Sequence, residues 1–156
     1  MSSLPKTILV PIDFSDPSRH ALDYAVGLAE SLGAKVYVLH AYEMPIVGLP
    51  DGAFVATSDM VCRIVEAANK ALADACGRYK GRQVVISAVL KQGDPREVIV
   101  DMAKEAQADL VVLGTHGRRG IARALMGSVT ESIIRISPVP VLTVHGAPAG
   151  PNARLA

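Results

Sequence analysis

The chain has 156 residues, of which half are apolar and a fifth are charged. This length and composition predict one folded domain with a buried core and exclude a disordered chain. The 16 Lys and Arg residues nearly balance the 15 Asp and Glu residues, so no charge excess indicates a nucleic-acid or membrane-surface partner.

The ends and the cysteines favour a cytoplasmic protein. The N-terminus lacks the basic and apolar regions of a secretory signal, and no apolar run approaches the ~18–20 residues that cross a bilayer. Cys62 and Cys76 fall within one predicted helix, about 21 Å apart at 1.5 Å per residue, which is too far for a disulfide. We therefore expect two reduced thiols rather than a redox or metal site.

The first elements alternate between strand and helix. The apolar run 6–13 predicts a buried strand. Asp16 as N-cap and Pro17 as first helical residue start a helix that Gly33 ends. Residues 35–41 predict a second strand.

A loop and a long helix follow. Residues 43–56 carry two Pro and two Gly without a clear period, which predicts a loop. Ser58 and Asp59 open a helix that ends near Gly81, and residues 83–90 predict the third strand.

Two capping signals mark the last helices. Asp94 is the expected N-cap before Pro95, and residues 109–114 predict the fourth strand. Ser128-x-x-Glu131 resembles a capping box, and the helix that it opens ends at Pro138. Val139 to Val144 form the fifth predicted strand, followed by a tail.

This order predicts an α/β fold with a single parallel sheet and helices on both faces. In such a sheet, ligands bind beyond the carboxyl ends of the strands, where the strand order reverses. Gly114 and Gly117 follow the fourth strand and allow close backbone approach to a ligand. Gly127 and Ser128 stand at a helix start, where free N–H groups suit an anion.

Arg118, Arg119 and Arg123 add positive charge to the same segment. Together these residues predict a phosphate-binding site. It is neither a Walker P-loop, since no G-x-x-x-x-G-K-[ST] occurs, nor a dinucleotide fingerprint.

From about residue 5 to 145, the chain resembles the ATP-binding branch of the universal stress protein family. The resemblance rests on the opening ILVPIDFSDPSRHAL, the strand end VLHA, the loop DLVVLGTHGRRG and the segment GSVTESIIRISPVPVLTV. The spacing Gly114-x2-Gly117-x9-Gly127-Ser128 matches that branch in full.

The resemblance implies a doubly wound, Rossmann-like sheet of the adenine nucleotide alpha hydrolase-like group, with five parallel strands in the order 3-2-1-4-5. It implies a universal stress protein domain over residues 1–146, and ATP, ADP or AMP as the ligand. The Pro and Gly residues of the tail independently predict that residues 147–156 are flexible. The sequence shows no dedicated metal cage, so any Mg²⁺ is expected to arrive with the phosphates and water. A homodimer would form through the last strand, Val139 to Val144.

The resemblance also assigns roles to residues at the strand ends. Asp13 would hold the ribose or adenine side of the nucleotide, and Pro11 and Ile12 would line the pocket for the base. Ala41 would contact adenine through its backbone. The glycines, Ser128 and Val129 would surround ribose and phosphates. The expected nucleotide-binding residues are Pro11, Ile12, Asp13, Ala41, Leu113, Gly114, His116, Gly117, Arg118, Gly127, Ser128 and Val129.

Alternatives remain open at several of these residues. Asp13 either contacts the ligand or caps the next helix, and Arg118 with Arg119 either binds phosphate or forms a solvated pair. His116 is interpreted as packing on the ligand rather than as a general base, because no acidic or nucleophilic partner adjoins it. His40 is interpreted as structural.

The function predicted is an ATP-binding stress-response regulator without a dedicated catalytic group. The alternatives are a weak ATP hydrolase of the same fold and a nucleotide-free dimeric interaction module.

Overall fold

A five-stranded parallel sheet forms the centre of the computed structural model, which describes residues 4–44, 47–49, 52–54, 57–115 and 126–145. The strand order is β5-β2-β1-β6-β7, and every neighbouring pair is parallel. The strands are β1 (Thr7–Pro11), β2 (Lys35–Tyr42), β5 (Val85–Gln92), β6 (Leu110–Gly114) and β7 (Val141–Val144). Numbered among the five expected strands, this order is 3-2-1-4-5, so the predicted fold class and topology are confirmed.

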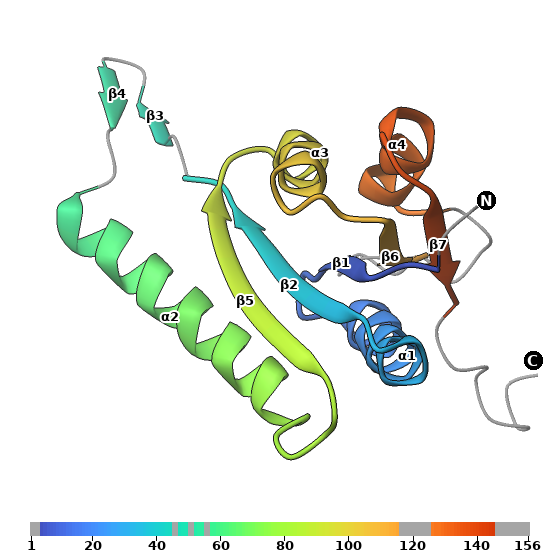
Figure 1. Ribbon diagram of the computed structural model, residues 1–156. Coiled ribbons are helices and arrows are strands. Elements are labelled where there is room, and N and C mark those ends of the chain that lie inside the picture. Colours follow the sequence, from blue (N-terminus) through green and yellow to red (C-terminus); the bar gives the residue numbers. More distant parts are fainter. Residues whose placement is uncertain (1–3, 45–46, 50–51, 55–56, 116–125, 146–156) are drawn as a thin grey trace, which may run out of the picture.

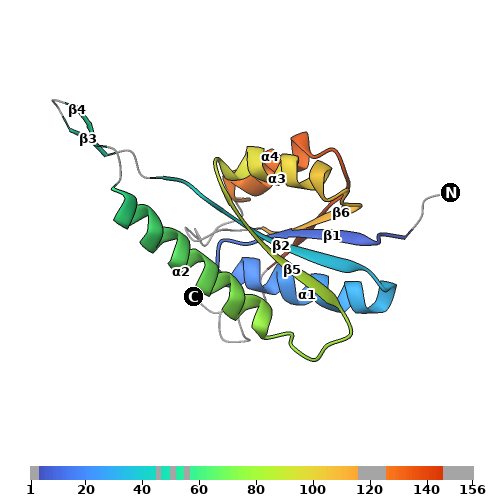
Figure 2. The same cartoon turned by 60° about the vertical axis from the view of Figure 1, so that its left-hand side comes forward.

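Helices cover both faces of the sheet (Figure 1). One face carries α1 (Asp16–Leu32) and α2 (Ser58–Gly77), and the other carries α3 (Pro95–Glu105) and α4 (Ser128–Ile136). Figure 2 shows α2 running along β5 at the margin of the sheet, with α1 beneath its centre. Among the helices in the described residues, none is long and apolar enough to cross a membrane.

Two apolar clusters, one on each face, form the core. In β1, Ile8 and Val10 pack in the cluster with α1, whereas Leu9 packs in the cluster with α3 and α4. All five residues of β1 are buried, which explains why its sequence is continuously apolar rather than alternating.

The start of α1 differs from the sequence prediction. Ser15, not Asp16, is the N-cap, since Ser15 has an extended backbone and its Oγ accepts from the Ser18 N–H at 3.4 Å. Asp16 and Pro17 therefore occupy the first two helical positions. Gly33 ends the helix in the left-handed conformation at φ 64°, as predicted.

The other two predicted caps have opposite outcomes. Asp94 caps α3 as predicted, and its Oδ1 accepts from the Arg96 N–H at 2.8 Å. The capping box predicted at Ser128 is wrong, because Gly127 is the N-cap of α4 and no side chain among the described residues bonds to that cap. Glu131 instead pairs with Arg135, one turn further along the helix, at 2.7 Å.

Residues 43–56, predicted to be a loop, contain an antiparallel hairpin of β3 (Val47–Leu49) and β4 (Gly52–Phe54). Figures 1 and 2 both show this hairpin projecting away from the central sheet. The loop prediction was wrong, because strands of three residues are too short to show a recognisable alternation of apolar and polar residues.

Several strand and helix ends are shifted from the predicted positions. Helix α2 ends at Gly77, and the turns that follow, with Gly81 at φ 89°, delay β5 to Val85. Strand β7 starts at Val141 rather than Val139, because the Ser137 hydroxyl bonds both the Val139 carbonyl and the Val139 N–H. The free thiols of Cys62 and Cys76 both lie on α2, as expected.

Candidate functional site

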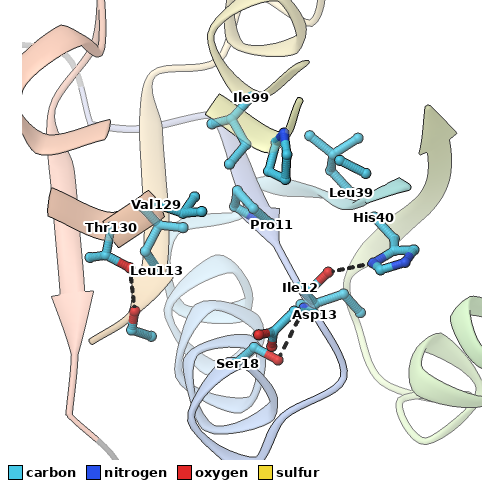
Figure 3. A pocket seen from close by; sticks show the side chains of 13 residues that line it. Pro11, Ile12, Asp13, Ser18, Leu39, His40, Ile99, Leu113, Val129 and Thr130 are labelled. Atoms are coloured by element: carbon cyan, nitrogen blue, oxygen red, sulfur yellow. Dashed lines mark hydrogen bonds between the residues drawn. The ribbon is translucent and has the colours of Figure 1, made fainter. Parts of the chain in front are cut away.

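A pocket opens at the carboxyl ends of β1, β2 and β6, between the starts of α3 and α4 (Figure 3). Strand β1 connects to β2 through α1 on one face, whereas β6 connects to β7 through α4 on the other. The boundary between β1 and β6 is therefore the point at which ligands bind in sheets of this kind. The pocket spans about 590 Å³ when its solvent-open mouth is included.

Apolar side chains form most of the pocket wall. Figure 3 shows Pro11, Leu39, Ile99, Leu113 and Val129 grouped around one recess, to which β1, β2, β6, α3 and α4 all contribute. Such a recess suits the flat faces of an aromatic ring system and disfavours a charged group. The residues lining the whole pocket are Pro11, Ile12, Asp13, Ser18, Leu39, His40, Ala41, Pro95, Ile99, Leu113, Gly114, Val129 and Thr130.

The turn after β1 brings a carboxylate to the pocket. Asp13 Oδ1 accepts from both the N–H and the hydroxyl of Ser15, and the Asp13 N–H donates to Ser18 Oγ at 3.4 Å. Asp13 thus shapes the turn before α1, while Ser15 caps the helix. The alternative in which Asp13 itself caps α1 is wrong.

The turn also holds Phe14 in the left-handed region, at φ 64°, which residues with a bulky side chain seldom adopt. The Phe14 ring packs against the ring of His40 on β2, with ring centroids 4.4 Å apart. His40 Nδ1 lies 2.8 Å from the Ile12 carbonyl oxygen. Because a carbonyl oxygen only accepts, Nδ1 carries the hydrogen and donates it.

The start of α4 supplies backbone N–H groups beside the recess. Gly127 is the N-cap at φ −59°, and its own N–H donates to the Thr115 carbonyl at 2.8 Å. Helical geometry leaves the first N–H groups without an acceptor inside the helix, and the helix dipole is positive at this end. Ser128 and Val129 occupy the first two helical positions, so their backbone is suited to an anion.

Two contacts fix α4 and α1 against β6. The buried Thr130 hydroxyl donates to the Gly114 carbonyl at 2.8 Å. On the other side of Gly114, a Cβ atom added to this residue would lie 2.7 Å from the carbonyl carbon and oxygen of Pro17. Gly114 is therefore required for the close approach of α1 to β6, a packing role that the sequence interpretation did not include.

A charged pair flanks Pro95, one of the lining residues, in the sequence. Arg96 hydrogen-bonds the Asp94 carboxylate, and this lowers the pKa of Asp94 from 3.8 to about 2. In the part of the chain that the structure describes, no group of three or more His, Cys, Asp or Glu side chains is arranged to hold a metal ion.

The structure brings seven of the twelve expected binding residues to this one pocket: Pro11, Ile12, Asp13, Ala41, Leu113, Gly114 and Val129. Gly127 and Ser128 directly precede Val129 at the helix start. His116, Gly117 and Arg118 lie outside the described residues, as do Arg119 and Arg123.

Sequence reasoning missed several lining residues, among them Leu39, Pro95 and Ile99. A signal for Pro95 existed. The helix start at Asp94-Pro95 follows a parallel strand, so the first turn of that helix had to lie at the same sheet edge as the other strand ends. His40, interpreted as structural, has a structural hydrogen bond and also lines the pocket.

Comparison with known proteins matches residues 5–145 to the model of the universal stress protein family. The chain belongs to this family. Universal stress protein MJ0531 of Methanocaldococcus jannaschii is 35% identical over 144 residues, covering 91% of this chain and 83% of that protein. A universal stress protein of Thermus aquaticus is 34% identical, covering 90% of this chain and 98% of the relative.

Solved structures of the family share the fold. A universal stress protein crystallised in complex with cAMP superimposes with a TM-score of 0.70 at 29% identity. That comparison covers 93% of this chain and all of the other. This family member therefore binds an adenine nucleotide.

Proposed function

We propose that this universal stress protein binds ATP or another adenine nucleotide at the carboxyl ends of β1 and β6 and acts as a cytoplasmic stress-response regulator. The observation that carries the proposal is the pairing of an apolar recess with a helix N-terminus in one pocket. A nucleotide combines an aromatic base with an anion, and the two halves of the pocket suit these two parts.

The base would lie in the recess between Pro11, Ile99 and Val129, with the backbone of Ala41 at its edge. An ionised carboxylate only accepts hydrogen bonds, and it repels phosphate. Of the parts of a nucleotide, the ribose offers two adjacent hydroxyl donors, so we assign the ribose to Asp13. The backbone of Gly127, Ser128 and Val129 would face the phosphates, with His116, Gly117 and Arg118 completing the site.

The described residues hold no metal-binding cluster, so any Mg²⁺ would bind through the phosphates and water. The cAMP complex of a relative makes cyclic AMP one of the ligands to compare with ATP, ADP and AMP.

Substitution of Gly127 tests the phosphate half of the site. The backbone of Gly127, at φ −59°, has a conformation open to residues with a side chain, so Gly127→Val adds bulk where a phosphate would pass without forcing backbone strain. We expect the variant to melt near the wild-type temperature and to lose at least about tenfold in ATP affinity, or 1.4 kcal/mol, by titration calorimetry. Unchanged affinity would show that phosphates do not pass this residue.

We also propose a homodimer formed through β7. Among the described strands, β7 lies at the margin of the sheet and pairs with β6 alone, and its four residues are partly exposed. An unpaired edge strand is a surface on which a second copy can pair. The mass of the protein in solution, measured by light scattering, tests this proposal.

A further inference from the structure

We propose that His40 is a positioning residue that holds the turn after β1 so that Asp13 presents its carboxylate to the ribose. The inference rests on the proposed nucleotide binding and names a residue that controls selectivity for the ribose hydroxyls. Figure 3 shows the His40 ring reaching from β2 to the Ile12 carbonyl, directly before Asp13 in the chain.

The turn needs support from outside itself. Strand β1 ends at Pro11, and the Ile12 N–H still bonds the Leu39 carbonyl at 2.8 Å. After this bond the chain leaves the sheet, and the Ile12 carbonyl accepts from a side chain, that of His40, at 2.8 Å. The hydrogen bond from His40 therefore replaces the strand-to-strand hydrogen bonds at the point where the backbone turns toward Asp13.

The same ring supports the strained residue of the turn. Phe14 adopts φ 64°, and its ring packs on His40 at 4.4 Å between centroids. Asp13 precedes Phe14, and the N–H and hydroxyl of Ser15 both donate to Asp13 Oδ1, so hydrogen bonds close the turn over residues 13–15. Two contacts from one imidazole therefore hold Ile12 and Phe14, the residues on either side of Asp13.

The chemistry of the contact fixes what a replacement must supply. The donor is Nδ1, so only a side chain with an N–H at that position preserves the bond. The amide nitrogen of Asn can occupy nearly the place of Nδ1, whereas the longer side chain of Gln places its amide near Nε2. His40→Asn should therefore retain the support of the Ile12 carbonyl, and His40→Gln should lose it.

The experiment compares the affinity of the full chain for ATP and for 2′,3′-dideoxy-ATP by titration calorimetry. We expect His40→Ala and His40→Gln to weaken ATP binding about tenfold, the scale of one lost hydrogen bond to a charged group. Binding of the dideoxy analogue, which has no ribose hydroxyls for Asp13, should change little. His40→Asn should recover most of the ATP affinity, and His20→Ala, an exposed histidine on α1, is the control and should leave both affinities unchanged.

A double variant separates positioning from general destabilisation. If His40 acts through Asp13, adding His40→Ala to Asp13→Ala should cause no further loss of ATP affinity. Three results would each overturn the inference. The first is an equal loss of affinity for ATP and for the dideoxy analogue, and the second is a double variant whose loss of ATP affinity is the product of the two single losses. The third is wild-type affinity in both His40→Ala and His40→Gln. If the wild-type chain binds ATP, these outcomes leave the proposed function standing; if it binds no nucleotide, both proposals fail.

Discussion

Gly114 provides the sharpest structural prediction, because backbone atoms of Pro17 and Ser18 fill the space that a side chain at this position would need. A Cβ atom at this position would lie 2.7 Å from the Pro17 carbonyl carbon and oxygen and 3.0 Å from the Ser18 nitrogen. Optimal carbon contacts are about 3.5–4.0 Å, so Gly114→Ala forces α1 away from β6 by several tenths of an ångström or more. The atoms that must move are backbone atoms in the first turn of a helix and cannot rotate away.

Overpacking of this kind costs about 1–3 kcal/mol. For a chain of this size, about 2 kcal/mol corresponds to a decrease in Tm of about 4–8 °C. Since Ser18 and Gly114 both line the pocket, the displacement should also weaken nucleotide binding. Scanning calorimetry without ligand measures the first effect, and titration of the same variant with ATP measures the second.

Gly27 is the matched control. It lies inside α1, and a Cβ atom added there meets no atom of the described residues within 4 Å. Gly27→Ala should raise the stability by about 0.5–1 kcal/mol, because alanine loses less conformational freedom than glycine in a helix. If Gly114→Ala has the Tm of the wild type while Gly27→Ala is more stable as expected, the inference that α1 approaches β6 too closely for a side chain at Gly114 is wrong.

The remaining predictions concern the α3 cap and the β7 edge. Hydrogen bonding to Arg96 lowers the pKa of Asp94 in the folded protein to about 2 from 3.8. The ionised Asp94 carboxylate therefore stabilises the folded state above about pH 4, and this stabilisation is lost as the pH falls toward 2. Asp94→Ala should cost about 1 kcal/mol in urea unfolding at neutral pH, and the gap to the wild type should narrow at about pH 2.5; a gap independent of pH would contradict the assignment. For the dimer, light scattering should give twice the chain mass of 16.4 kDa, and a mass of one chain at micromolar concentration would refute pairing through β7.

Much of the fold was predictable because the apolar pattern reflects burial on both faces. The run around β1 is continuous because Ile8 and Leu9 face opposite cores. Asp94-Pro95 was correctly interpreted as a helix start, since both residues act locally. The strand order required the family resemblance, because periodicity alone does not determine which strands are neighbours.

The errors occurred where local patterns compete or where packing decides. Ser15 and Asp16 are both good N-caps, and the choice depends on the backbone angles that the Asp13 turn imposes. Ser128 resembles a cap, but Gly127 occupies that position because its N–H is bound to Thr115 at the end of β6. Short strands such as those of the hairpin carry no periodic signal.

For the site, the strand ends were predictable, and the contribution of Ile99 from α3 was not. Pro11, Asp13 and Gly114 follow from the rule that ligands bind at the carboxyl edge of the sheet. Ile99 lies within a helical apolar stripe, and only the packing of α3 over the sheet shows that it faces the pocket as well as the core. The contact of His40 with the Ile12 carbonyl joins residues 28 apart in the chain and needs the three-dimensional structure.

Calorimetric titration of the wild-type protein with ATP, ADP, AMP and cyclic AMP tests the central proposal most directly. We predict saturable binding of at least one of these nucleotides with one site per chain, and weaker binding of the same nucleotide to Gly127→Val. The absence of heat of binding for all four at millimolar concentration, from protein purified free of nucleotide, would contradict the assignment of this pocket as an adenine nucleotide site.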